Sequence, residues 1–145
     1  MQLITDGAVL SRALLACIRR YRRMAFASAW ASSGTPVFGA LLKHRDKIDR
    51  AVIGTHFYQT DPQVLRDFVG SPVVRFRLQP SGVFHPKVFL FWSGRDWAAL
   101  IGSANLTKGA FGPNAEVMVH ATSDDATSAF RDELRATIKG YWREA

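Results

Sequence analysis

The residues best suited to chemistry lie in one stretch of the chain, residues 84–117. His85 and Lys87 open a strongly apolar run, 88–92, which predicts a buried strand. A histidine can act as a nucleophile or base near neutral pH, and a lysine supplies a compact positive charge. The pair is therefore suited to handling a phosphate group.

A second polar group follows the next apolar run. A turn at 93–96 and a run at 97–101 lead into Gly102-Ser103-Ala104-Asn105, and Glu116 begins a third predicted strand, 116–120. Neighbouring strands would carry an imidazole, an ammonium, two neutral hydrogen-bonding side chains and a carboxylate to the same region. Such a set is suited to handling a phosphate group.

The pattern His85-x-Lys87 followed by Gly102-Ser103-Ala104-Asn105 resembles the phospholipase D superfamily, whose sites pair an HxK element with a downstream GSxN element. The superfamily's usual Asp, five positions after the Lys, is replaced here by Trp92. One branch also lacks that Asp, the metal-independent restriction endonucleases similar to BfiI, which use HxK, then Asn, then Glu. This chain resembles that branch, with Glu116 as the last member of the set.

The resemblance implies catalytic roles for His85, Lys87, Asn105 and Glu116. His85 would be the nucleophile in one subunit, forming a phosphohistidine, and the general acid in the other. Lys87 and Asn105 would stabilise the phosphate oxygens, so that no metal or other cofactor is needed. Glu116 would accept a hydrogen bond from the second ring nitrogen of His85.

Other residues are expected to support phosphate and nucleic-acid binding. By the same resemblance, Ser103 would donate a hydrogen bond to the phosphate and Gly102 would let the backbone approach it. Four basic residues are candidates for contacts with a nucleic-acid backbone, although solvated side chains would also explain them: Lys108, Arg95, Arg75 and Arg77.

One HxK motif in the chain implies two chains in the site. Attack and departure lie on opposite sides of phosphorus, so one imidazole cannot easily serve both roles. His44, His56 and His120 are not followed by a Lys two residues later, although His56 follows a predicted strand and is a further candidate for the cleft. A two-fold homodimer would supply the second His85, and we expect sheet edges and motif loops to meet at its axis.

The composition is that of a globular protein. The chain has 145 residues, 48% of them hydrophobic and 21% charged, which suits one domain over 1–145. A formal net charge of +7 and a pI near 10.2 favour a polyanionic partner, with nucleic acid first and an anionic membrane surface second. A plain basic surface is the simpler alternative.

The single cysteine, Cys17, allows no internal disulfide and no cysteine-based zinc site. It falls on the apolar side of a predicted helix, which indicates a buried thiol. No signal peptide or membrane-spanning run is evident in the sequence. We therefore expect a cytoplasmic protein with no membrane partner.

Periodicity predicts an α/β protein. Asp61 is expected to cap a helix with Pro62 in its first turn. Strands that alternate with helices favour a layered sheet, and the resemblance implies the same phospholipase D-like mixed sheet flanked by helices in α/β/α layers. The predicted helices cover 8–23, 36–47, 61–69 and a last segment that begins at 124–125; further strands cover 24–30, 51–54 and 73–78, followed by a turn at 79–82.

Two helix faces carry further expectations. The first helix would present Arg12, Arg19 and Arg23 on one side, and the last would bury the stripe Phe130, Leu134, Ile138 and Trp142. An arginine stripe suits phosphate backbones, and a solvated helix face is the alternative.

Three functions remain open on the sequence. The first is a metal-independent phosphodiesterase, an endonuclease acting on DNA. The sequence does not distinguish a DNA substrate from an RNA substrate. The second is a non-catalytic nucleic-acid-binding module of the same fold, which Trp92 favours. The third is a phosphodiesterase acting on phospholipids. A place in a larger defence or repair system is compatible with the first.

Overall fold

The computed structural model describes residues 1–78 and 81–145. Its strands are β1 Gln2–Ile4, β2 Arg23–Ser28, β3 Ile48–Gly54, β4 Val74–Arg77, β5 Lys87–Ser93, β6 Asp96–Gly102 and β7 Met118–Thr122. Its helices are α1 Gly7–Arg20, α2 Pro36–Lys43, α3 Pro62–Phe68 and α4 Ser128–Glu144, with short 3-10 turns at Arg45–Lys47 and His56–Tyr58. Of the turn predicted at 79–82, residues 79–80 lie outside the described residues.

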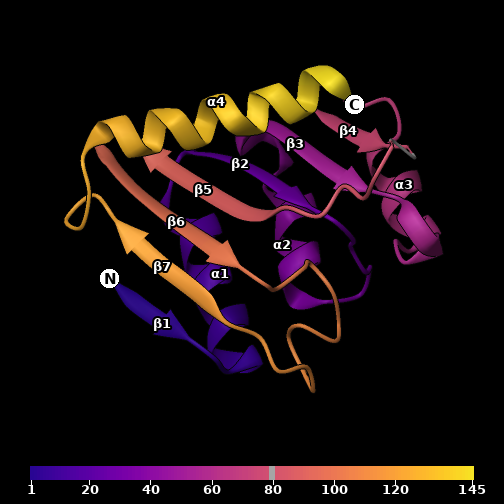
Figure 1. Ribbon diagram of the computed structural model, residues 1–145, viewed down its shortest axis with the longest axis horizontal. Coiled ribbons are helices and arrows are strands. Elements are labelled where there is room, and N and C mark those ends of the chain that lie inside the picture. Colours follow the sequence, from indigo (N-terminus) through magenta and orange to yellow (C-terminus); the bar gives the residue numbers. More distant parts are fainter. Residues whose placement is uncertain (79–80) are drawn as a thin grey trace.

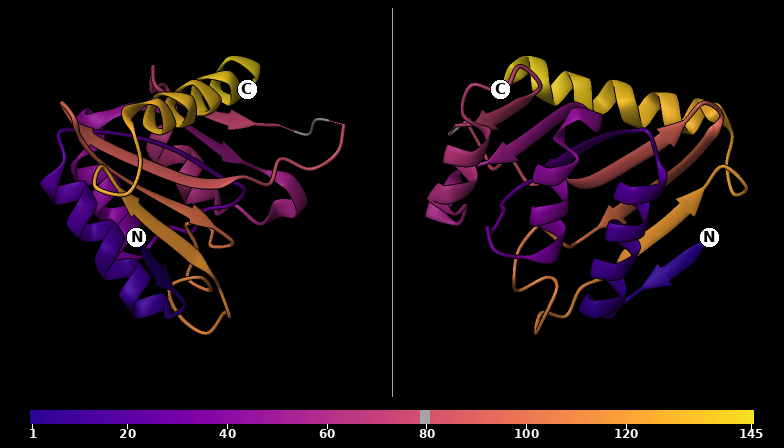
Figure 2. Two further views of the ribbon diagram at one scale, coloured as in Figure 1. Left: turned by 60° about the vertical axis from the view of Figure 1, so that its left-hand side comes forward. Right: turned by 180° about the vertical axis from the view of Figure 1, so that it is seen from behind.

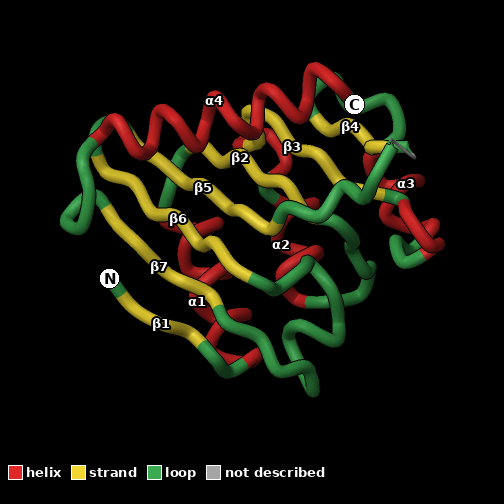
Figure 3. Tube along the Cα trace, in the orientation of Figure 1, coloured by secondary structure: helices red, strands yellow, loops and turns green. Residues whose placement is uncertain are grey.

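All seven strands form one mixed sheet in the order β1-β7-β6-β5-β2-β3-β4 (Figures 1 and 3). β2, β3 and β4 run parallel, whereas β5 runs antiparallel to β2. The remaining neighbours, β5 to β6, β6 to β7 and β7 to β1, are also antiparallel. The beginning of β5 therefore lies beside the ends of both β2 and β6.

The sheet is covered on both faces, as predicted for α/β/α layers. α1 and α2 lie on one face and α4 lies alone across the other (Figure 2). The sequence of β5 is apolar throughout because the strand is buried on both faces. Phe89 and Phe91 join the core under α1, while Val88 and Leu90 join the core under α4. A strand buried on both faces shows a continuous apolar run rather than alternation.

The first helix is shorter than its periodicity predicts. Asp6 caps α1 by accepting a hydrogen bond from the Val9 amide at 3.0 Å, but the helix ends at Arg20 because Tyr21 is extended. Arg23 begins β2 instead of extending the arginine stripe, and it pairs with Asp49 at 3.4 Å. The prediction of Arg23 on this helix was wrong, since local periodicity does not register the pairing of β2 with β3 and β5.

The boundaries of the middle elements are closer to the predictions. Asp61 caps α3 by accepting from the Gln63 amide at 3.0 Å, and Pro62 is its first residue, which confirms that prediction. α2 ends at Lys43 and a 3-10 turn takes the predicted last turn. β3 begins three residues earlier than predicted, at Ile48.

Two elements near the C-terminus begin later than predicted. β7 starts at Met118, so Glu116 lies in the loop before it. α4 starts at Ser128, with Asp125 in the preceding turn, where it binds the N-terminal ammonium at 2.6 Å. Of the predicted buried stripe, Ile138 is fully buried, whereas Phe130 is 38% exposed.

Two smaller predictions concern Cys17 and the membrane. Cys17 lies on the buried face of α1, which confirms the prediction of a buried thiol, and burial raises its pKa to about 11. Among the described residues, no helix is long and apolar enough to cross a membrane.

Candidate active site

Five predicted site residues line one cleft of about 480 Å³, at the edge of the sheet where β5 begins: His85, Lys87, Ser103, Asn105 and Glu116. The cleft forms there because the beginning of β5 meets the ends of two antiparallel neighbours. Lys87 lies opposite Ser28 of β2, and Val88 lies opposite Ile101 of β6. The other lining residues are Trp30, Ser32, Gln59, Thr107, Gly109 and Asn114.

Lys87 and His85 form the centre of the cleft. The Lys87 ammonium lies 2.7 Å from Nδ1 and 2.8 Å from Nε2 of His85, and it donates to the His85 carbonyl at 3.0 Å. The lysine side chain is buried, at 8% exposure, whereas His85 is open to the cleft. Trp30 supports the imidazole in an edge-to-face contact, with ring centroids 5.5 Å apart.

These surroundings disfavour protonation of the imidazole. Partial desolvation, and then the positive charge of Lys87, lower the pKa of His85. Desolvation also lowers the pKa of Lys87, while the negative charge of Glu116 acts in the opposite direction. A neutral imidazole has a free lone pair, which a nucleophile needs.

Asn105 is held through its amide oxygen. That oxygen, Oδ1, accepts a hydrogen bond from the Trp30 amide at 3.3 Å and lies 3.3 Å from the Ser28 hydroxyl. Ser28 is fully buried, donates to the Trp30 carbonyl at 2.7 Å and accepts from the Leu106 amide at 3.1 Å. Among the described residues, Nδ2 of Asn105 has no hydrogen-bond partner, so this donor is available to a ligand in the cleft.

Glu116 makes contacts that differ from those predicted. Its carboxylate accepts hydrogen bonds from the Ser103 hydroxyl and from Nδ2 of Asn114 at 3.3 Å. No hydrogen bond joins it to His85 within the part of the chain that the structure describes. The Ser103 hydroxyl is also occupied, because it accepts from the Val117 amide at 2.9 Å while donating to Glu116. Ser103 therefore orients the carboxylate in this structure.

Gly102 is required by the protein backbone itself. A Cβ at this position would clash with the Val117 carbonyl and would lie 2.8 Å from Sδ of Met118. The glycine lets β6 and the start of β7 approach closely, and this approach brings Ser103 beside Glu116. Gly102 thus permits a close approach of backbone to backbone, and its expected approach to a phosphate stays a prediction.

Trp92, at the position of the superfamily's usual Asp, lies outside the cleft. It packs in the core under α4, 9% exposed, with the Arg135 guanidinium 4.8 Å from its ring centroid. It lies five positions along β5 from Lys87, about 17 Å at roughly 3.3 Å per residue. A side chain at this position contacts the α4 layer rather than a phosphate beside His85.

The four predicted backbone-binding residues occupy different places. Lys108 is beside the cleft, where its amide donates to the Ser32 hydroxyl at 3.3 Å. Arg95 lies in the β5–β6 turn, at the opposite end of β5 from the cleft. Arg75 and Arg77 hold the end of α4, donating to the carbonyls of Trp142 at 3.0 Å and Glu144 at 2.6 Å. Of these four, Lys108 is the one that lies beside the cleft, between its lining residues Thr107 and Gly109.

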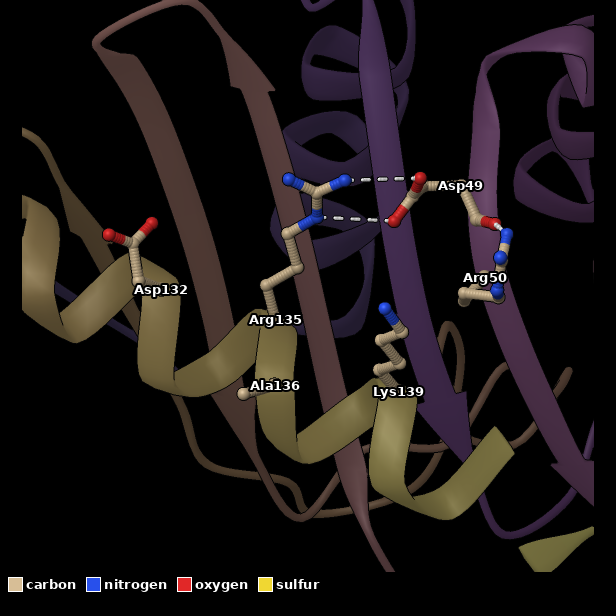
Figure 4. A pocket seen from close by; sticks show the side chains of 6 residues that line it. All are labelled: Asp49, Arg50, Asp132, Arg135, Ala136 and Lys139. Carbon is tan, nitrogen blue, oxygen red and sulfur yellow. Dashed lines mark hydrogen bonds and ion pairs between the residues drawn. The ribbon is translucent and has the colours of Figure 1, made fainter. Parts of the chain in front are cut away.

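A second hollow, of about 390 Å³, lies between α4 and β3 (Figure 4). Arg135 reaches from α4 and binds both carboxylate oxygens of Asp49, at 3.2 and 3.3 Å. The Arg50 guanidinium lies 4.5 Å from the ring centroid of Trp142. The Arg135–Asp49 ion pair and the cation–π contact of Arg50 with Trp142 hold α4 against the sheet, which is a structural role.

Sequence reasoning missed Trp30 and Ser28 and misplaced His56. Trp30 and Ser28 belong to the end of the predicted strand 24–30, and the only signal was that β2 would have to lie beside β5. His56 is buried, and its ring nitrogens have no hydrogen-bond partner among the described residues. Its backbone carbonyl contributes by accepting from Trp30 Nε1 at 3.0 Å.

No group of three or more His, Cys, Asp and Glu side chains that could hold a metal ion is found in the described residues. The cleft presents the imidazole of His85, the ammonium of Lys87, the amide of Asn105 and the carboxylate of Glu116.

Comparisons with known proteins agree on the fold. Residues 54–138, more than half of the chain, match the family model described as cardiolipin synthase, PLD-like domain. The fold is similar to Nuc from Salmonella typhimurium, a phospholipase D family member, with a TM-score of 0.71 at 14% identity, covering 98% of this chain and 94% of that one. No curated protein matches the sequence.

Two further solved structures share the fold. NucT from Helicobacter pylori has a TM-score of 0.62 at 18% identity, covering 99% of this chain and 92% of that one. TrmBL2, an archaeal chromatin protein described with a novel mode of DNA binding, has a TM-score of 0.63 at 9% identity, covering 99% of this chain and 53% of that one. With the family match and the mixed sheet, these findings place the chain in the family of phospholipase D-like domains.

Proposed function

We propose that the protein is a metal-independent endonuclease that cleaves DNA phosphodiesters through a phosphohistidine, in a site shared by two copies of the chain. The observation that carries this proposal is the grouping of His85, Lys87 and Asn105 in one cleft. The His85 imidazole, whose pKa is lowered, stands 2.7 Å from the buried Lys87 ammonium. The same cleft is lined by Asn105, whose Nδ2 has no hydrogen-bond partner among the described residues. These are the parts that attack at phosphorus requires.

The reaction balances with two histidines. A ring nitrogen of His85 attacks phosphorus while the bond to the leaving oxygen breaks, and the partner's His85, protonated, gives its proton to that oxygen. Water then attacks the phosphohistidine, its proton passes to the partner's His85, and the bond between phosphorus and nitrogen breaks. Each histidine returns to its starting state.

The charges in the cleft support this division of roles. A bound phosphodiester brings a negative charge, which raises the pKa of the histidine that must be protonated. Lys87 and Nδ2 of Asn105 stabilise the charge that develops on the phosphate oxygens. Glu116, held by Ser103, favours the ammonium form of Lys87, and we assign it this role in place of a contact with His85.

Electrostatics favours a nucleic acid, with its chain of phosphates, as the substrate. The chain carries a net charge of +7, and Lys108 stands beside the cleft. A polyanion gains affinity from such a surface through release of counterions. The similarity in fold to TrmBL2, which is described as binding DNA, supports the same choice.

The proposal is tested by DNA cleavage in excess EDTA. We expect the wild-type chain to cut plasmid and single-stranded DNA, and His85→Ala to lose this activity. His44→Ala is the matched control, because His44 lies at the end of α2. Loss of wild-type cleavage on chelation would contradict the metal-independent mechanism.

Mixed subunits test the shared site. After subunit exchange between wild type and His85→Ala, a site that needs two histidines gives activity that falls with the square of the wild-type fraction. Sites that work independently give a linear fall, and this result would overturn the shared site.

A second candidate is a nucleic-acid-binding module without catalysis. The fold of TrmBL2, a chromatin protein, favours it. Its signature would be retention of DNA by both wild type and His85→Ala in a gel shift, with no cleavage by either protein.

A further inference from the structure

Two adjacent aromatic residues, Phe57 and Tyr58, project from the surface in an unfavourable backbone conformation. Their side chains are 62% and 101% exposed. Both have positive φ angles, 57° and 54°, in the left-handed region that bulky residues rarely occupy. Tyr58 contributes nothing to the core, so packing does not explain a strained backbone that holds it outside.

The loop that carries the two rings, residues 55–60, is fastened on both sides. Thr55 donates to the Arg77 carbonyl through its amide at 3.2 Å and its hydroxyl at 3.0 Å. The Thr60 hydroxyl donates to the Gly54 carbonyl at 2.6 Å and accepts from the Ala31 amide at 3.3 Å. Strained residues persist where their surroundings fix them, and such places are often binding sites.

This loop adjoins the candidate active site. It follows the carboxyl end of β3, beside the end of β2, and its Gln59 lines the cleft. Trp30 joins loop and site, because its Nε1 donates to the His56 carbonyl at 3.0 Å while its ring contacts His85. The exposed rings therefore stand next to the place where we put the phosphodiester.

We propose that Phe57 and Tyr58 form a stacking platform for unpaired nucleobases of a single-stranded nucleic acid whose phosphodiester occupies the cleft, an inference that rests on the proposed function. Every base has a π face, so exposed aromatic rings bind single strands with little sequence preference. In a duplex the faces of the bases are already stacked on one another. The platform accordingly favours single-stranded substrates over duplexes.

The test measures binding in the cleavage-deficient His85→Ala background by fluorescence anisotropy. The probes are a single-stranded oligonucleotide, its duplex, and the same backbone with abasic tetrahydrofuran sites. Tyr58→Leu should weaken binding of the single strand about 10-fold, since stacking contributes roughly 1–3 kcal/mol per base and 1.4 kcal/mol is a factor of ten. Binding of the duplex and of the abasic strand should change less than about 2-fold by the same reasoning.

Two variants serve as controls. Tyr58→Trp keeps an aromatic face and should retain binding of the single strand. Phe130→Leu removes an exposed aromatic ring on α4, which packs against Trp97 with ring centroids 5.8 Å apart, and should leave all three affinities unchanged.

The proposal is overturned if Tyr58→Leu has no effect, or if it weakens the abasic strand or duplex as much as the single strand. Sedimentation velocity measures whether Tyr58→Leu also changes the oligomeric state. If the oligomeric state and the affinity change together, the rings belong to an interface between copies of the chain and the proposal is overturned. Cleavage of the abasic strand by the wild-type chain tests the phosphodiesterase reaction without any base that could stack. The stacking platform and the phosphodiesterase function can thus fail separately.

Discussion

The ammonium of Lys87 lies across the imidazole of His85, within 2.7 and 2.8 Å of its two ring nitrogens. One buried cation thus has two effects. It disfavours the protonated imidazole, and it marks where a phosphate oxygen can be neutralised beside the nucleophile.

The first prediction concerns the pKa of His85. Partial desolvation and then Lys87 lower this pKa from the ordinary value of 6.5, so the neutral nucleophile persists below pH 6.5 and the acid limb of the cleavage rate lies there. Lys87→Met removes the second cause and should raise the pKa, with desolvation still opposing protonation. An NMR titration of the His85 ring protons measures the change.

His120 is the internal control for that titration. Burial and the N-terminal ammonium lower its pKa, and Lys87 is not among the causes. Lys87→Met should therefore leave His120 unchanged, and an equal shift of both histidines would show that the substitution disturbs the fold rather than the local charge.

A second prediction concerns the amide of Asn105. Asn105→Asp keeps an oxygen for the Trp30 amide but replaces the Nδ2 donor with a negative oxygen, which would repel the proposed phosphate. We expect the cleavage rate to fall by about 100-fold or more, as for loss of one donor to a charged transition state. Thermal unfolding should change little, which distinguishes lost chemistry from lost structure.

Ser28→Ala is the contrasting variant. It leaves the Leu106 amide and the Trp30 carbonyl without their buried partner, which costs about 1–3 kcal/mol of unfolding free energy. Its effect on the rate should be smaller than that of Asn105→Asp. If Ser28→Ala lowers the cleavage rate as much as Asn105→Asp does while the protein stays folded, Ser28 acts in the reaction itself.

How the strands meet explains which parts of the site could be predicted. His85, Lys87 and Asn105 are close in sequence to two strands of one hairpin, β5 and β6, so an apolar run, a turn and a second run were enough to bring them together. The turn itself is marked by Gly94, whose φ is 58°. Local pattern therefore predicted the centre of the cleft.

Long-range pairing determines the rest. Ser28 and Trp30 reach the cleft only because β2 lies beside β5 with Ser28 opposite Lys87, a register that no local pattern encodes. The partner of Glu116 depends on how β7 enters the sheet two residues later than predicted. The dimer and the DNA substrate remain predictions.

A third prediction concerns Gly102. In Gly102→Ala the added methyl meets the Val117 carbonyl and Met118, so β7 must move away from β6. Overpacking of this kind costs about 1–3 kcal/mol, and the displaced Ser103 no longer orients Glu116. Urea unfolding and the cleavage rate should both decline. Gly39→Ala is the matched control, because a Cβ there has no neighbour within 4 Å and alanine favours the helix.

The fourth prediction restores the residue that the superfamily usually has after HxK. Trp92→Asp puts a carboxylate into the core under α4 and removes the ring beneath Arg135. Loss of a buried tryptophan costs about 3–5 kcal/mol, and the position is about 17 Å from Lys87 along the strand. We expect lower stability and no gain in cleavage.

Trp92→Phe distinguishes the expected loss of stability from the expected absence of any effect on cleavage. It keeps an aromatic ring in the core and should retain more of the stability at an unchanged rate per folded molecule. If Trp92→Asp folds and cleaves DNA faster than the wild type, the carboxylate acts on the cleft from the far end of β5. The tryptophan would then restrict activity, rather than serve only to pack α4 against the sheet.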